Sequence, residues 1–252
     1  MEKIQIREYN IQHINPSSTW IILGPPNSGK SYFITDLIYY NSYKYPVCRV
    51  NTSVPSTYKD YCSIFPPITV HAKFNEKDEE NLIEKRQKPL SMLEHPGTSC
   101  VYILDDINKN ASFNSSFFKD IFQKGRHYNL LTIVVNQNAL EFPPSLRSAA
   151  TYIVIFKFDK ESDKRKLFEN YASKKLFENY QKFSEIYDNL TNDHSCMIIK
   201  KPDKNVNEEE TLKNCVFYYK GDGTKKRWKF GCQELRNWSS ARIDESKIQE
   251  FC

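Results

Sequence analysis

Short apolar runs alternate along this chain with longer segments of helical periodicity. Glycine, proline or polar residues bound the runs, which is typical of β-strands, and the runs from Val101 onward are continuously apolar, as in strands buried on both faces. Strands are predicted at residues 19–23, 48–51, 68–71, 101–105, 131–136 and 152–158. Helices are predicted at residues 30–40, 76–93 and 115–124, with a longer one between 161 and 190. This alternation predicts an α/β fold with a mainly parallel central sheet flanked by helices.

The long charged helix contains an internal repeat. KLFENYASK, which begins at Lys166, is followed directly by KLFENYQKF, which begins at Lys175. In one continuous helix, nine residues at ~100° each displace the second copy by about half a turn. We therefore expect one copy to face the core and the other to face solvent or a neighbouring subunit. A duplication tolerated on a surface helix is the simpler explanation.

Two further strand-like runs, residues 196–200 and 216–220, follow the repeat, and a polar, acidic loop separates them. They predict a small C-terminal β extension of the sheet. The hydrophobic core itself is expected to be complete by about Phe158.

Charge and cysteine content narrow the class of protein. The 252 residues carry 36 basic and 31 acidic side chains, and this near balance favours a localised anion site over a polycationic tail. Seven cysteines without a CxxC pair predict reduced thiols. A zinc site built from His194, Cys196, Cys215 and Cys232 is an alternative, but their spacing matches no familiar zinc module. No apolar run reaches the ~18 residues of a membrane span, so no such span is expected.

The segment WIILGPPNSGKSYFITDLI carries the phosphate-binding loop signature, Gly24, four residues, then Gly29, Lys30 and Ser31. An apolar strand precedes the loop and a helix follows it, which is the context that the signature requires. Glycines let the backbone bend around an anion, and the helix dipole favours negative charge there. Lys30 is predicted to bridge the terminal phosphates of ATP, and Ser31 to hold Mg²⁺. The predicted phosphate-binding residues are Gly24, Pro25, Pro26, Asn27, Ser28, Gly29, Lys30, Ser31 and Tyr32.

The segment VYILDDI places two acids at the end of a predicted central strand. Asp105 is predicted to hold the magnesium shell, and Asp106 to act as the base that polarises water for attack on the γ-phosphate. The alternative is that both acids only cap the following turn. Glutamate is the commoner residue at the second position, and aspartate is one methylene shorter.

The segment KGRHYNLLTIVVNQ ends a third predicted strand in a polar amide, Gln137. This is typical of P-loop enzymes in which an extra strand lies between the phosphate-loop strand and the acid-bearing strand, so that the amide lies beside the γ-phosphate. Such an arrangement suits ATP hydrolysis coupled to motion. The chain contains no NKxD motif of a GTPase and no arginine-rich lid of a nucleotide kinase.

Together, GPPNSGKS, VYILDDI and GRHYNLLTIVVNQ, in this order and spacing, resemble the genome-packaging ATPases of large DNA viruses and virophages, the poxvirus-type branch of the FtsK/HerA P-loop superfamily. PPSLRSAATYIVIF and YDNLTNDHSCMIIKKPD resemble downstream segments of that family, so the resemblance runs from about residue 19 to 219. It implies a RecA/FtsK-like ATPase core at residues 18–200, preceded by an N-terminal extension, 1–17, and followed by a C-terminal extension, 201–252, packed on the core.

The resemblance further implies a ring-forming motor that threads double-stranded DNA into a preformed capsid. The implied partners are DNA, further copies of the chain in a ring of roughly five or six, and a capsid or portal vertex protein, in the viral factory of the host cytoplasm or with the virion. Each subunit would supply an arginine to its neighbour's ATP; Arg126 is the first candidate and Arg147 the second. Either arginine is alternatively a surface residue or part of an ion pair at the sheet edge.

A basic segment near the C-terminus, GDGTKKRWKFG, is predicted to contact DNA. Lys225, Lys226, Arg227 and Lys229 surround Trp228, a composition suited to phosphate contact with an aromatic anchor. The alternative is a solvated basic turn with Trp228 packed into the domain. Two alternative functions also stay open: a capsid-independent DNA-pumping ATPase or helicase, and an ATP-binding assembly module that does not hydrolyse.

Overall fold

The computed structural model describes residues 5–93, 97–107, 111–139, 142–172, 174–201, 214–224 and 228–243. Over these residues the chain forms one sheet of nine strands in the order β1-β9-β8-β7-β2-β6-β5-β3-β4. The strands are β1 (Arg7–Glu8), β2 (Thr19–Leu23), β3 (Val47–Thr52), β4 (Val70–His71), β5 (Cys100–Asp105), β6 (Leu130–Asn136), β7 (Tyr152–Ile155), β8 (Ser195–Lys200) and β9 (Val216–Lys220).

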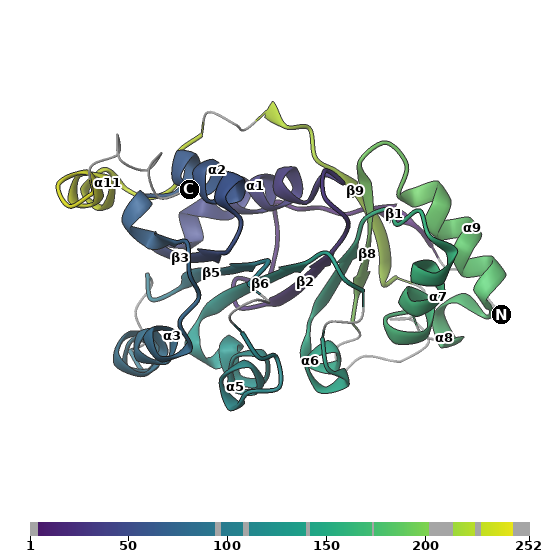
Figure 1. Cartoon of the computed structure of the whole chain (residues 1–252), viewed down its shortest axis with the longest axis horizontal. Helices are drawn as coiled ribbons and strands as arrows, with labels where there is room; N and C mark the ends of the chain where they lie inside the picture. The colour runs from purple at the N-terminus through teal and green to yellow at the C-terminus, as the bar shows by residue number, and fades with distance from the viewer. Residues whose placement is uncertain are drawn as a thin grey trace.

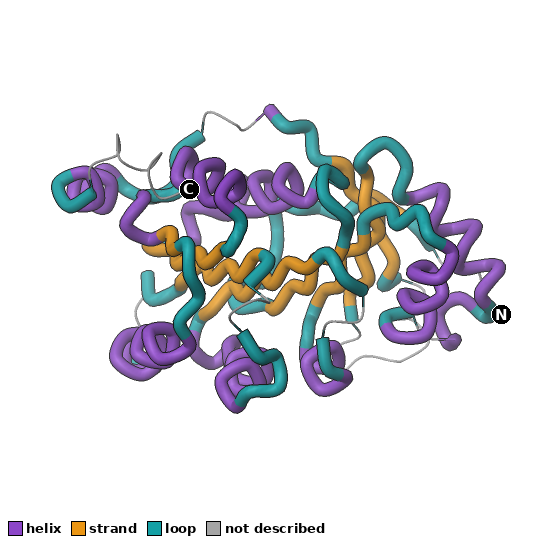
Figure 2. Tube along the Cα trace, viewed as in Figure 1, coloured by secondary structure: helices purple, strands orange, loops and turns teal. Residues whose placement is uncertain are grey.

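Helices cover both faces of the sheet (Figures 1 and 2). Helices α1 and α2 pack on one face, and α3, α5, α6, α7, α8 and α9 belong to the other. Their bounds are α1 (Lys30–Asn41), α2 (Pro55–Ile64), α3 (Glu76–Leu82), α4 (Lys88–Ser91), α5 (Ser116–Lys124), α6 (Pro144–Ala149), α7 (Glu161–Asn170), α8 (Lys174–Phe177), α9 (Tyr180–Leu190) and α11 (Gln233–Ser240). Short 3₁₀ turns are η1 (Ser42–Lys44), η2 (Pro67–Thr69) and η4 (Gly125–Tyr128), and η3 (Ile83–Gln87) is a π-helical turn.

The centre of the sheet confirms the predicted α/β class. Every residue of β2, β5 and β6 is buried, as their continuous apolar sequences predict. Strand β6 pairs in parallel with β2 on one side and β5 on the other, so a strand does lie between the loop-bearing and acid-bearing strands. The carboxyl ends of these three strands therefore meet at one edge of the sheet.

The predicted C-terminal β extension is also confirmed. Strand β8 pairs antiparallel with β7, and β9 pairs antiparallel with β8. Side chains of both strands enter the two core clusters, Cys196 and Ile198 in one and Met197 and Val216 in the other. The core therefore continues beyond Phe158, because the extension brings apolar residues to both faces.

Several predicted boundaries were wrong. The strand expected at 68–71 is only β4, because residues 67–69 form η2. The helix expected at 76–93 ends at Ser91 and contains the π-turn η3 just before Pro89. The strand expected to reach Phe158 ends at Ile155. Four elements were not predicted from the sequence: β1, α2, α6 and α11.

The repeat does not lie in one helix, so its predicted orientation was also wrong. Helix α7 ends at Asn170, α8 covers only Lys174–Phe177, and α9 begins at Tyr180 after a left-handed residue, Glu178 with φ 56°. This break turns the second copy back toward the sheet. Phe168 and Phe177, equivalent positions of the two copies, are 8% and 0% exposed and belong to the same core cluster.

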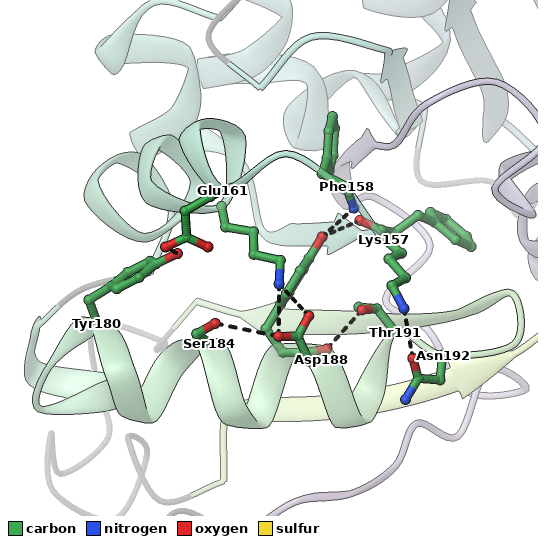
Figure 3. Close-up of polar contacts among 11 residues, drawn as sticks. Lys157, Phe158, Glu161, Tyr180, Ser184, Asp188, Thr191 and Asn192 are labelled. Carbon is green, nitrogen blue, oxygen red and sulfur yellow. Dashed lines mark hydrogen bonds and ion pairs between the residues drawn. The ribbon is translucent and has the colours of Figure 1, made fainter.

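Polar contacts attach α9 to the segment that follows β7 and to α7 (Figure 3). The Tyr187 hydroxyl donates to the Phe156 carbonyl at 2.8 Å and accepts from the Phe158 amide at 2.7 Å. Lys164 of α7 forms an ion pair of 2.6 Å with Asp188 of α9. The Tyr187 bonds thus use the carbonyl of residue 156 and the amide of residue 158, just beyond the end of β7 at Ile155.

Truncating the repeat should therefore destabilise the protein at both copies. Phe177→Ala removes a fully buried ring, and we expect it to lower the free energy of unfolding by about 3–5 kcal/mol, with Phe168→Ala at the lower end of that range. Urea unfolding followed by circular dichroism measures both. A loss for only one of the two variants would contradict the packing of both copies on the core.

Candidate nucleotide site

A cleft of about 540 Å³ opens at the carboxyl edge of the sheet, between the phosphate-loop segment, the start of α1 and helix α2. Pockets of this size hold small-molecule ligands. The cleft is lined by Asn27, Ser28, Gly29, Lys30, Ser31, Tyr32, Thr35, Asp36, Asp60, Ser63, Ile64, His194 and Gly223. Six of the nine predicted phosphate-binding residues, 27 to 32, are among them; Gly24, Pro25 and Pro26 are not.

Two glycines of the loop are required by close packing and backbone shape. A Cβ atom on Gly24 would lie 2.7 Å from the Cβ of Phe156 and 2.6 Å from the Ser28 hydroxyl, so no side chain fits. Gly29 has φ 111°, a left-handed conformation that other residues rarely adopt. Asn27, the other left-handed residue of the loop, has φ 60°. The loop is therefore a tight turn, with no room for a side chain at Gly24 and a left-handed backbone at Asn27 and Gly29.

The Lys30 ammonium lies inside this turn. It donates to the carbonyls of Gly24 and Pro25, at 2.7 Å each, so these residues hold the lysine in place. Burial lowers the pKa of Lys30, and the negative charges of Asp105 and Asp106 oppose that shift. The positive charge of the loop thus faces the two acids that end β5.

Asp105 is 5% exposed and accepts a hydrogen bond of 2.8 Å from the Tyr61 hydroxyl. Burial raises the pKa of Asp105 to about 6, and the Asp106 charge adds to the effect. The Tyr61 hydrogen bond and the Lys30 charge act the other way. Asp105 is therefore a buried carboxyl whose ionised form is stabilised by the Tyr61 hydroxyl and the Lys30 charge.

Asp106 and Gln137 lie together. The Gln137 side-chain amide donates to the Asp106 carboxylate, across the ends of β5 and β6. Asp106 has φ 50°, a left-handed conformation that aspartate tolerates, and its amide donates to the Val135 carbonyl at 3.3 Å. The turn after β5 therefore aims this carboxylate toward the end of β6.

Ser31 and Tyr32 begin α1 at the cleft, and both side chains are exposed. The Tyr32 side chain lies against the loop that follows β9: a Cβ atom on Gly221 would be 2.9 Å from the Tyr32 Cβ, and one on Gly223 would be 3.3 Å from its ring. Below it, buried Asp36 accepts from the Tyr219 hydroxyl at 3.0 Å. The C-terminal extension therefore forms one wall of the cleft.

The two candidate arginines lie away from the cleft, at the amino edge of the parallel strands. Arg126 is exposed in η4, just before β6. Arg147 is half-buried in α6, with its guanidinium 5.5 Å from the centre of the Tyr171 ring. Neither forms an ion pair with any residue that the structure describes, so the ion-pair alternative has no support there.

The predicted DNA-contacting segment is described only in part. Lys225, Lys226 and Arg227 lie outside the described residues. Trp228 is half-buried, with its ring centre 5.5 Å from that of Tyr39 and 6.0 Å from that of Phe230, as the alternative of a packed tryptophan expects. Lys229 is exposed.

The cysteines do not form a metal site in the part of the chain that the structure describes. Cys196 and Cys215 belong to different core clusters, on opposite faces of the sheet, and Cys232 is exposed at the start of α11. No group of three or more His, Cys, Asp or Glu side chains there could hold a metal ion. Among the same residues, no helix has both the length and the apolar character needed to cross a membrane.

The sequence analysis missed Tyr61, Phe156 and His194 as residues of the site. Tyr61 lies on the overlooked helix α2, whose signal was Pro55 at its first turn followed by buried Tyr58, Tyr61 and Cys62 on one face. Phe156 was assigned to a strand. His194, with φ 60°, lines the cleft in the turn before β8; the sequence suggested it only as a zinc ligand.

The sequence from residue 11 to residue 218 matches the family described as Poxvirus A32 protein. The chain belongs to this family. The match spans the loop, the paired acids, Gln137 and the sheet extension through most of β9, and it confirms the resemblance that the three motifs indicate. Viral relatives include uncharacterized protein 088R of Invertebrate iridescent virus 3, which is 28% identical over 252 residues, with 94% of each chain covered.

Another relative of this A32 family member is uncharacterized protein L437 of Acanthamoeba polyphaga mimivirus, 26% identical with 93% of this chain and 83% of that protein covered. Among solved structures, the genome packaging NTPase B204 of Sulfolobus turreted icosahedral virus 2 in complex with AMP matches with a TM-score of 0.52 at 16% identity. The match covers 74% of this chain and 94% of B204. At this identity it shows a shared fold, that of a P-loop NTPase.

The buried Asp105 should make stability depend on pH. Its pKa of about 6 exceeds the ordinary 3.8, so the stability that its protonation provides is present below pH 3.8 and lost as pH rises through 6. At pH 7 the folded protein bears the cost of ionising this buried carboxyl, and Asp105→Asn removes that cost. We expect the variant to raise the free energy of unfolding by about 3 kcal/mol at pH 7, with no gain below pH 4.

Urea unfolding at several pH values measures this difference, with the exposed Asp60→Asn as control. Tyr61→Phe removes the donor to Asp105 and should raise the pKa of that carboxyl further. A gain for Asp105→Asn that is independent of pH would contradict the assignment.

Proposed function

We propose that this protein is the ATP-hydrolysing motor that moves viral double-stranded DNA into a preformed capsid. The observation that carries the ATPase part is the convergence of Lys30, Asp105 and the Asp106–Gln137 pair at one edge of the sheet. A cation held in the glycine turn, a buried acid and a second acid bonded to an amide are the kinds of group that enzymes of phosphoryl transfer use.

In this proposal the loop amides of residues 27–32 and the Lys30 ammonium bind the phosphates. Lys30 would exchange its carbonyl partners, Gly24 and Pro25, for phosphate oxygens. Ser31 and Asp105 fit Mg²⁺, since both offer oxygen ligands, and the remaining ligands would come from nucleotide and water. When bound, the ion would neutralise charge on the phosphates. Asp106 would accept a proton from the attacking water, and Gln137 would orient the Asp106 carboxylate and the water.

The comparisons support the motor part of the proposal. B204 carries the same fold, is described as a genome packaging NTPase, and was solved with AMP and with AMPPCP. The described relatives belong to large DNA viruses, an iridescent virus and a mimivirus. By this analogy the partners are double-stranded DNA, further copies of the chain and a capsid or portal vertex protein, in the viral factory of the host cytoplasm.

Phosphate release with and without duplex DNA separates a motor from an ATP-binding assembly module, which would release none. A triplex-displacement assay then separates a duplex translocase, which strips the third strand, from a helicase, which separates the duplex. The capsid-independent pump is tested in the virus: Asp106→Asn should yield capsids without DNA, and filled capsids would contradict packaging.

Lys30→Ala should abolish both nucleotide binding and turnover, because it removes the charge that faces the phosphates. Asp106→Asn should leave ATP affinity nearly unchanged and stop hydrolysis, since a base acts in the transition state more than in the ground state. Titration with a fluorescent ATP analogue and single-turnover phosphate release measure the two effects. Equal loss of binding in both variants would show that the roles are divided wrongly.

The ring part of the proposal predicts complementation between two inactive proteins. If Arg126 reaches the ATP of a neighbouring subunit, Arg126→Ala should still bind ATP. It should lose the part of the ATPase activity that rises with protein concentration. Arginines supplied by a partner raise the rate of phosphoryl transfer ~10³- to 10⁵-fold in other systems. Mixing Arg126→Ala with Asp106→Asn creates interfaces in which Asp106 and Arg126 are both intact, so partial activity should return.

Arg147→Ala mixed with Asp106→Asn is the matched test of the second candidate. Recovery with Arg147→Ala alone would assign the role to Arg147. No recovery with either variant, while mixed rings form, would contradict an arginine acting across subunits.

A further inference from the structure

A second pocket, of about 240 Å³, lies between the end of α2, η2 and helix α11. In Figure 1, α11 lies beyond the outer end of α2, on the same side of the sheet. One wall comes from Ile64 of α2, Pro67 of η2, and Phe65 and Pro66 between them. The polar wall comes from Lys229, Gln233, Arg236, Asn237, Ser239 and Ser240.

This pocket is positively charged. Lys229 and Arg236 both line it, and none of its lining residues within the described ranges is acidic. The Nε atom of Arg236 is buried and has no hydrogen-bond partner among the described residues. A buried guanidinium nitrogen without an acceptor is costly, and an anion in the pocket would satisfy it.

Hydrogen bonds fix the polar wall to the core. The Phe230 amide donates to the Ile64 carbonyl at 2.8 Å, and the Ile68 amide donates to the Ser239 hydroxyl at 3.2 Å. Gly231, with φ 88°, makes the turn into α11. The two cations therefore project from anchored backbone, unlike those of a free basic tail.

We propose that this pocket binds a backbone phosphate of double-stranded DNA. Guanidinium, ammonium, amide and hydroxyl groups are the donors that phosphate oxygens accept from in protein–DNA complexes. Lys229 is the last cation of the basic run in GDGTKKRWKFG, so the pocket continues that run. On the same helix, Trp238 is 46% exposed and carries the Arg242 guanidinium 4.7 Å from its ring. The proposal rests on the proposed DNA motor, and it adds the place where DNA is held.

The pocket shares a wall with the nucleotide cleft. Ile64 of α2 lines both, and Tyr61 of the same helix donates to Asp105. Ring contacts run from Tyr61 to Phe65, 5.9 Å between centres, and from Phe65 to Phe230, 5.3 Å. A phosphate held by Lys229 and Arg236 thus lies one helix away from the predicted magnesium ligand. The packed rings between them would couple DNA binding to the ATPase site.

The test is duplex DNA binding by the full chain, measured as fluorescence anisotropy over a range of salt concentrations. The double variant Lys229→Gln with Arg236→Gln should bind random-sequence duplex about tenfold more weakly, and its plot of log affinity against log salt should be shallower by about 1 to 2. A matched control, Lys85→Gln with Lys119→Gln, removes two exposed cations from the other face and should change both quantities less.

Lys229→Gln alone, on an exposed side chain, serves if the double variant fails to fold, and it should lower the salt slope by about 1. Equal duplex affinity in the double variant and the control would contradict the proposal that this pocket binds DNA. The same conclusion holds if the pocket binds free phosphate instead. The proposed motor function would still hold after that outcome if DNA stimulates the ATPase activity of the wild-type protein. A wild-type protein that neither binds duplex nor responds to it overturns the motor and the pocket together.

Discussion

Strand β2 is paired in parallel with β6 along its whole length and with β7 from Trp20 to Leu23, and the position of the phosphate loop depends on this double pairing. Leu23 ends opposite Asn136 of β6 and Ile155 of β7. The next bonds, Gly24 amide to Asn136 carbonyl and Phe156 amide to Leu23 carbonyl, carry the pairing into the loop. Because Phe156 is fixed in this way, Gly24 has no room for a side chain. A register shift of one residue would point the acids of β5 and the loop to opposite faces.

Helix α2 links the sheet to the chemistry of the site, because its Tyr61 bonds the buried Asp105. Burying Asp105 raises its pKa, and the Tyr61 hydroxyl offsets part of that cost by donating to the ionised form. The same helix then separates two pockets, one lined by the phosphate loop and the other by Lys229 and Arg236. An element with no motif of its own thus connects the acid that would hold magnesium with a cationic surface.

Much of this arrangement could be predicted from the sequence. The bounds of β2 follow from its continuous apolar run, and the order of β6 between β2 and β5 was predicted from the terminal amide Gln137, by its likeness to P-loop enzymes with an extra strand at that place. Features that depend on contacts between residues far apart in the sequence could not be predicted from local patterns. Residues 161–190 favour helix throughout, and the breaks between α7, α8 and α9 occur because Phe168 and Phe177 both pack on one core cluster. Tyr61 was missed because the short helix α2, between two strands, has a weak apolar pattern.

The two carbonyls that hold Lys30 have a kinetic consequence. Gly24 and Pro25 accept from the ammonium at 2.7 Å each, in a turn already fixed by sheet bonds and glycine geometry. In the proposed function, an incoming triphosphate would replace these carbonyls after a rotation of the Lys30 side chain, with no backbone to be ordered. Rotations of exposed side chains take picoseconds to nanoseconds and typical turnover takes milliseconds or longer, so the half-buried Lys30 has a margin of several orders of magnitude. Loop assembly would then never limit the cycle, and its pace would be set by steps that involve other elements, such as subunit contacts and movement of the polymer.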